Sequence, residues 1–227
     1  MQLESSDKSS YIDASRWHGH ENCLNQMFTL YREKVNSLIC VYNSLTGTFP
    51  IGVMNELRDV MTHMTQSLLY QEEEKVVQHL YKAQRHLKRA VVDAFKYVSM
   101  AYSDEYDAFL ETYKNVDLSY IDNGELLPKL TRLNSEAEQL MIEAKMIESD
   151  IHEDDQMYAA YERCFNRYSE LYDCMINAIE DADRLKLRAA EEAKLKEKEH
   201  RTDRTIGIIG VAVGVIGVVI GIIGFII

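Results

Sequence analysis

Residues 206–227 constrain this chain more than any other stretch. They read IGIIGVAVGVIGVVIGIIGFII and contain no charged side chain, no polar side chain and no proline. As a helix they would extend roughly 33 Å, close to the thickness of the hydrocarbon core of a bilayer. An apolar stretch of this length either spans a membrane or is buried in a large protein, and the rest of this chain is too small and too polar to bury it. The sequence therefore predicts a C-terminal transmembrane helix.

The glycines of this segment follow a seven-residue repeat, because their spacings alternate between three and four. The six positions are Gly207, Gly210, Gly214, Gly217, Gly221 and Gly224. On a helix they form one stripe, and small residues let helix backbones approach closely in lipid. We expect the helix to self-associate through this stripe; the alternative is that glycine only tunes the flexibility of an anchor.

Charge and targeting signals indicate the compartment. The formal net charge of the chain is −12, which argues against nucleic-acid binding by overall charge. No N-terminal signal peptide is recognisable, and several Lys and Arg residues immediately precede the apolar segment. The positive-inside rule therefore places the preceding domain in the cytoplasm. We expect a tail-anchored, single-pass protein of the inner (cytoplasmic) membrane.

The four cysteines form neither a CxxC pair nor a cluster with histidine. They are Cys23, Cys40, Cys164 and Cys174. This distribution predicts neither a zinc site nor a disulfide framework and is typical of a reducing compartment. We expect no metal and no cofactor.

Apolar residues recur at spacings of three and four through most of the chain, without an alternating strand pattern, so the predicted fold class is all-α. We expect helices over 21–44, 53–70, 71–102, 103–116 and 126–147, with Ser103 capping the fourth. A last helix should run from about residue 153 into the apolar segment. The predicted organisation is a flexible N-terminus (1–18), a helical bundle (19–180), a helical stalk (181–205) and a transmembrane helix (206–227).

The last helix carries an apolar stripe close to a heptad spacing. Its members are Met157, Tyr161, Phe165, Tyr168, Tyr172, Met175 and Ile179. Such a stripe packs either on the bundle or on a partner chain. We interpret its tyrosines as core or interface residues and not as a surface for stacking bases.

One short motif has the pattern R-D-x-x-x-H, formed by Arg58, Asp59 and His63. It resembles the signature of the HEPN superfamily, small helical domains common in bacterial toxin and antiviral systems, whose active members are metal-independent ribonucleases. The resemblance implies that His63 is a general acid or base on the ribose 2′-hydroxyl. It also implies that Arg58 steadies the phosphate charge and that Asp59 fills the polar second position.

Helix geometry sets a condition on this motif. Positions five apart differ by about 140° around a helix axis, so Arg58 and His63 would flank opposite edges of one apolar face. A composite site then needs a second chain across a two-fold axis, an arrangement known in the HEPN family. The alternatives are a HEPN-like fold without catalysis, and boundary residues that lie beside a core stripe. Whether the protein is an enzyme stays open.

The 71–102 region carries the clearest basic run of this acidic chain. Four of its residues share one side of the expected helix: Lys82, Arg85, His86 and Arg89. Such a patch can bind RNA, a nucleotide or a phosphate. The alternative is that it pairs with acidic helices of the same bundle or of a neighbouring subunit.

Three functions are consistent with these features. The first is a homo-oligomeric effector that permeabilises the membrane through its glycine-rich spans. The second is a membrane-tethered dimeric HEPN ribonuclease, and the third is an adaptor or scaffold that uses the span only as an anchor. The HEPN resemblance implies a setting in bacterial antiviral defence, with RNA, a nucleotide or a larger defence complex as the trigger.

Overall fold

The computed structural model describes the backbone of residues 14–150 and 154–226 and the side chains of residues 14–150 and 155–198. All the regular elements in these ranges are helical, which confirms the predicted all-α class. The described chain divides into two compact units. One comprises Met1–Phe109 with Pro128–Ile176, and the other comprises Leu110–Leu127 with Asn177–Ile227.

The first helical run of the chain contains a π turn. Helix α1 (Glu21–Leu30) continues through η2 (Tyr31–Val35), which is the π turn, into α2 (Asn36–Thr46). Gly47 ends the run in the left-handed conformation (φ 69°), which glycine adopts without steric cost. The predicted 21–44 helix is therefore present, with a change of hydrogen-bond register inside it.

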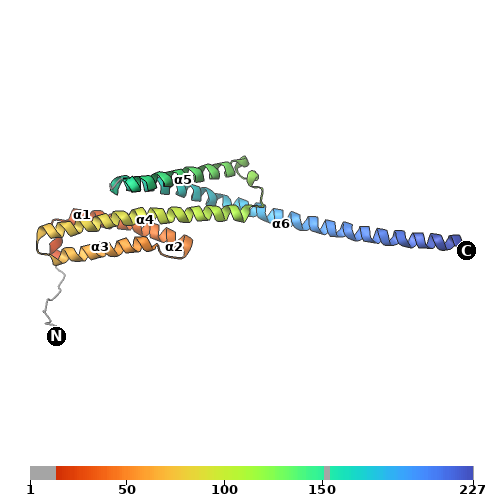
Figure 1. Cartoon of the computed structure of the whole chain (residues 1–227), viewed down its shortest axis with the longest axis horizontal. Helices are drawn as coiled ribbons and strands as arrows, with labels where there is room; N and C mark the ends of the chain where they lie inside the picture. Colours follow the sequence, from red (N-terminus) through yellow and green to blue (C-terminus); the bar gives the residue numbers. More distant parts are fainter. Residues whose placement is uncertain (1–13, 151–153, 227) are drawn as a thin grey trace, which may run out of the picture. The chain divides into compact units, whose positions relative to one another are not determined.

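Helix α3 (Ile51–Leu69) and helix α4 (Glu73–Tyr113) are joined by three residues. So short a connection makes the two helices antiparallel neighbours, and they lie side by side in Figure 1. At the C-terminal end of α3, the short 3-10 helix η1 (Ala14–Trp17) packs on the bundle, where the Trp17 indole donates a hydrogen bond to Ser67 (3.0 Å).

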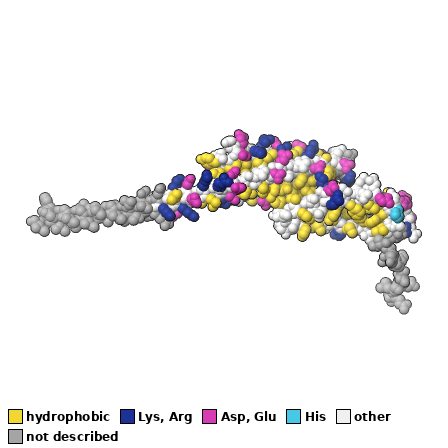
Figure 2. Space-filling model, turned by 180° about the vertical axis from the view of Figure 1, so that it is seen from behind, with side chains coloured by type: hydrophobic (Ala, Val, Ile, Leu, Met, Phe, Trp, Pro, Cys, Tyr) yellow, Lys and Arg dark blue, Asp and Glu magenta, His cyan; other side chains and the backbone are white. Residues whose placement is uncertain are grey.

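Helix α4 forms the centre of the first unit. Its Tyr97 ring packs edge-on against Tyr42 of α2, and its Phe95 ring packs edge-on against Tyr158 of helix α6 (Asp154–Ile226). Lys96 pairs with Glu148 of helix α5 (Leu126–Asp150) at 2.6 Å. The core of this unit is therefore built around a single helix. On the face drawn in Figure 2, hydrophobic side chains lie in patches between charged ones.

The predicted break before residue 103 is wrong, because α4 continues to Tyr113. Local sequence favoured a cap at Ser103, but the apolar spacing continues across it. Tyr102, Tyr106, Phe109 and Tyr113 follow at spacings of four, three and four, and each is at most 7 % exposed. Burial of four large aromatic side chains outweighs a weak local preference for capping.

The apolar stripe of α6 is covered within the chain. Tyr161 and Tyr168 are buried, Phe165 lies against Phe95, and the Tyr172 ring stacks on Tyr102 at 4.6 Å. This settles the two alternatives for the stripe in favour of the bundle. The interpretation of these tyrosines as core residues is confirmed.

Helix α6 then continues to Ile226 without a break. From Asp183 to Lys198 its residues are exposed, apart from a half-buried Leu185. The apolar segment 206–227 and its six glycines lie outside the side chains that the structure describes. Within the described part of the chain, no helix is both long enough and apolar enough to cross a membrane.

Candidate functional site

Four rings follow one another along the contact between α3 and α4. The ring centroids of Tyr70 and His79 are 5.2 Å apart, those of His79 and His63 5.3 Å, and those of His63 and His86 5.2 Å. We call this series of Tyr70, His79, His63 and His86 the ring ladder. All four of these rings carry a titratable group.

Hydrogen bonds fix the ladder at two points. Nδ1 of His63 lies 3.1 Å from Nδ1 of His79, and Nδ1 of His86 lies 2.7 Å from Oε2 of Glu56. An imidazole nitrogen donates only when it carries a proton, so the His63–His79 bond needs one protonated and one bare nitrogen. The bond is therefore lost when both nitrogens carry protons.

The surroundings of His63 and His79 favour neutral imidazoles. Burial lowers the pKa of His63, and the neighbouring charges of His86, His79 and Lys82 lower it further, while Asp59 opposes them. Burial and Lys82 likewise lower the pKa of His79. The lowered pKa values of His63 and His79 therefore favour the neutral form of both rings.

A seven-residue spacing in the sequence produces this arrangement. Glu56 and His63 lie seven apart on α3, and His79 and His86 lie seven apart on α4, while Tyr70 follows His63 after a further seven residues, just beyond the end of α3. Seven residues are close to two helical turns, so each set returns to the same edge of its helix. Because the helices are antiparallel, the two edges meet in order. The ladder as a unit was missed from the sequence, although this spacing was visible in it.

The structure separates the members of the R-D-x-x-x-H motif. The Arg58 guanidinium pairs with its neighbour Asp59 (3.1 Å) and is largely exposed, whereas His63 turns toward α4 and the ladder. Within the described chain, the recorded contacts join His63 to His79 and His86 but do not join it to Arg58. Any site that uses both residues therefore has to be completed from elsewhere.

The basic run of α4 is partly neutralised by the chain itself. His86 bonds Glu56, Lys88 pairs with Asp155 (2.6 Å), and Lys96 pairs with both Asp93 and Glu148. Lys82 is exposed and adds its charge to the surroundings of the ladder. Of the two alternatives predicted for the basic run, pairing with acidic residues of the same chain is therefore found for His86, Lys88 and Lys96.

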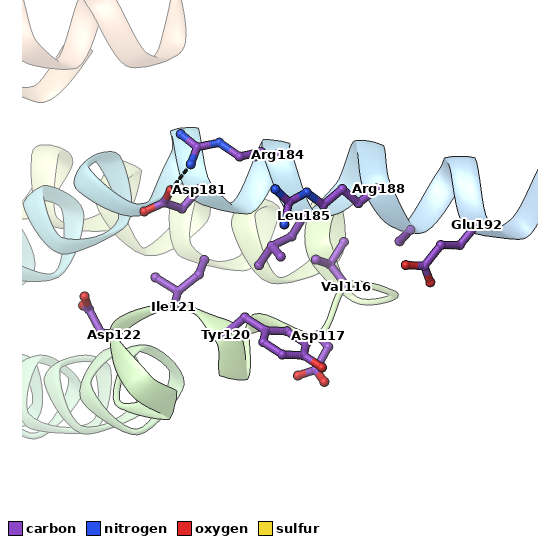
Figure 3. A pocket seen from close by; sticks show the side chains of 11 residues that line it. Val116, Asp117, Tyr120, Ile121, Asp122, Asp181, Arg184, Leu185, Arg188 and Glu192 are labelled. Carbon is purple, nitrogen blue, oxygen red and sulfur yellow. Dashed lines mark ion pairs between the residues drawn. The ribbon is translucent and has the colours of Figure 1, made fainter.

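The second unit holds a separate cavity of about 680 Å³ between α6 and the segment that follows α4. In Figure 3 the side chains of Val116, Ile121 and Leu185 lie between α6 and this segment, and the Tyr120 ring lies farther from α6 than they do. Four carboxylates line it (Asp117, Asp122, Asp181 and Glu192) against Arg184 and Arg188. Asp181 pairs with Arg184 at 3.3 Å. This balance of charge does not suit a polyanion.

The segment beside this cavity has an unusual backbone. Asp122, Asn123 and Gly124 have successive φ angles of 50°, 53° and 91°, a left-handed conformation that Asp and Asn tolerate better than most residues. At its start the Asp117 carboxylate accepts a hydrogen bond from the Ser119 backbone N–H (3.0 Å). These local bonds shape the wall of the cavity.

Among the described residues, no group of three or more His, Cys, Asp or Glu side chains is placed to hold a metal ion. Comparisons of the chain with protein-family models, with curated proteins and with solved structures found no match.

Proposed function

We propose that the protein is a membrane-anchored helical effector that self-associates through residues 206–227 and thereby perturbs the bilayer. The observation that carries this proposal is that α6 has side chains buried in the bundle from Ala160 onward and continues as one helix to Ile226. Its last residues belong to a stretch without a single charged side chain. A helix of that length matches the hydrocarbon core of a bilayer.

The glycine repeat supports self-association. Apolar side chains gain little from meeting one another in lipid, so helices associate there where small residues permit close backbone packing. Six glycines on one stripe supply such a surface. The aromatic stripe of α6 gives no further support, because its side chains are covered within the same chain. The proposed association therefore depends on the glycine repeat.

Replacement of two glycines tests the proposal. Gly214→Leu with Gly217→Leu keeps the segment apolar and long enough to insert, but the bulky side chains hold neighbouring backbones apart. Ile216→Leu with Val219→Leu lies off the stripe and is the matched control. We expect wild type and control to release dye from vesicles and to be toxic in cells, and the glycine variant to insert without either effect.

Two outcomes would contradict this proposal. Recovery of the full-length protein in the soluble fraction without detergent would remove the membrane anchor. If the glycine variant is as toxic and as leaky as wild type, the segment is only an anchor, and the adaptor function takes first place.

A second candidate, a ribonuclease, is favoured by the ring ladder. The lowered pKa of His63 keeps its imidazole neutral near pH 7, the form that acts as a general base, and Lys82 lies close enough to affect that pKa. If His63 is catalytic, His63→Ala and Arg58→Ala should each abolish RNA cleavage without affecting membrane insertion. His18→Ala is the control, because that ring is largely exposed. If purified wild type cleaves no RNA, this candidate is dropped.

A further inference from the structure

A second feature of α3 involves residues other than those of the ring ladder. There a pocket of about 360 Å³ opens between α3 and the first helical run. Its wall includes Met27, Phe28 and Tyr31 from that run and Met61 and Met64 from α3, with Leu87 of α4 also contributing. Three helices therefore enclose the pocket.

The pocket has a buried floor and an exposed rim. Met27 and Leu87 are each 2 % exposed, whereas Phe28 is 52 % and Met61 62 % exposed. All the lining side chains are aliphatic, aromatic or thioether groups, and none is charged. Because a charged group buried there would find no partner, the inserted part of any ligand has to be uncharged.

The π turn lies at the edge of the same pocket. The Tyr31 backbone N–H donates to the carbonyls of both Met27 and Phe28, and the Asn36 N–H donates five residues back to Tyr31. π turns are rare and occur frequently at functional sites. Of the three residues that the first helical run contributes to this wall, Tyr31 is the first residue of the π turn, and Met27 and Phe28 accept the hydrogen bonds of its backbone N–H. This backbone feature is independent of the apolar lining, and it too marks the site.

We propose that this pocket binds the uncharged aliphatic chain of a lipid or of another small molecule. Its volume is more than twice the roughly 150 Å³ of an apolar cavity that accepts benzene. The three methionines of its wall have flexible, polarisable side chains that adapt to irregular apolar shapes. Met27, Val60, Met64 and Leu87 form the buried floor of the pocket, so a hydrocarbon chain that enters past the exposed rim exchanges water for apolar contacts.

The proposal does not depend on membrane anchoring, and it is tested with the full-length protein in lipid nanodiscs. The probe is an uncharged long-chain alcohol carrying a photoreactive diazirine, and cross-linked peptides are mapped by mass. Site mapping separates labelling of the pocket from labelling of residues in the bilayer. We expect saturable labelling within residues 27–31 and 57–64, reduced by excess unlabelled decanol.

Two methionines supply a matched pair of variants. Met61 on the pocket rim is 62 % exposed, and Met100 on α4, outside the pocket, is 60 % exposed. Met61→Asp should lower the labelling about tenfold, because it adds a charge to an apolar site, whereas Met100→Asp should leave it unchanged. Phe28→Ala, which removes a ring from the exposed rim without adding charge, should lower it less. Thermal melting identifies any variant that fails to fold.

Three results would overturn the proposal. The first is labelling that does not saturate. The second is equal labelling of the Met61→Asp and Met100→Asp variants. The third is a pocket that stays unlabelled until the protein is diluted to a monomer, which would show that a second copy of the chain fills it.

Discussion

Two stretches of helix α6 carry a repeat of three and four residues, but they differ in the size of the side chains that form it. In residues 157–179 the repeat consists mostly of aromatic rings, and the structure covers them with the chain's own helices: Tyr161 is 1 % exposed and Tyr168 4 %. In residues 207–224 the repeat consists of glycine. Large rings fill a core, whereas glycine lets backbones approach in lipid. Spacing alone therefore does not identify the partner, and side-chain size is the better guide.

The largest effect is expected from a cavity in the aromatic stretch. Leu171 is fully buried, so Leu171→Ala should lower the free energy of unfolding by about 2–5 kcal/mol, measured by urea denaturation. Leu187→Ala is the control, because Leu187 is 67 % exposed on the same helix. The comparison predicts that neither variant changes the mass of the folded protein in detergent. A change of mass in the Leu171 variant would show that this stretch also joins copies of the chain.

A smaller effect is expected where α6 leaves the buried region. There the Tyr113 hydroxyl donates a hydrogen bond to Asp183 at 2.6 Å. Tyr113→Phe removes the donor and should cost about 1–3 kcal/mol, toward the lower end because Asp183 is exposed to water. Thermal melting checks this, and no loss of stability would mean that the bond adds nothing to the packing.

Alkaline pH gives a second measure of this contact. Burial and the neighbouring Asp183 raise the pKa of Tyr113 to about 12. As the pH rises above about 10, the unfolded tyrosine ionises first, so stability should fall toward pH 12. The Tyr113→Phe variant should show a shallower fall over this range. An unchanged slope would contradict the raised pKa.

The smallest effect is expected at the ring ladder, because His63 and His79 are only partly buried. Their lowered pKa values mean that the unfolded state takes up protons first as the pH falls below about 6.5, so the free energy of unfolding should decrease. A His63→Gln, His79→Gln double variant should lose part of this dependence, and His18→Gln should keep it. Acidification should leave the mass in detergent unchanged, since the ladder lies outside the glycine repeat.

Much of the fold was predictable because it depends on periodicity. The helix positions and the buried tyrosines of α6 follow from apolar residues recurring on one face, and the antiparallel pairing of α3 with α4 follows from their short connection. The continuation of α4 past Ser103 was missed because local capping preference was given more weight than the spacing of Tyr102, Tyr106 and Phe109. The π turn at Tyr31 leaves no comparable signal, since one extra residue in a turn barely changes the apolar pattern.

The candidate sites were less predictable because they depend on pairs of helices. His63 was singled out through its motif and His86 through the basic run, but their contact requires the register of α3 against α4. To predict the apolar pocket, one would also need to know that the first helical run places Phe28 and Tyr31 beside Met61 of α3. Seven-residue spacing of polar residues on two adjoining helices was the one usable signal for the ladder.

The mass of the protein–detergent complex, measured for three full-length proteins, tests self-association through the glycine repeat most directly. The proteins are wild type, Gly214→Leu with Gly217→Leu, and Ile216→Leu with Val219→Leu. Our account predicts an oligomer for wild type and for the Ile216/Val219 variant, and a monomer for the glycine variant. The same oligomer in all three proteins, or a monomer in all three, would contradict it.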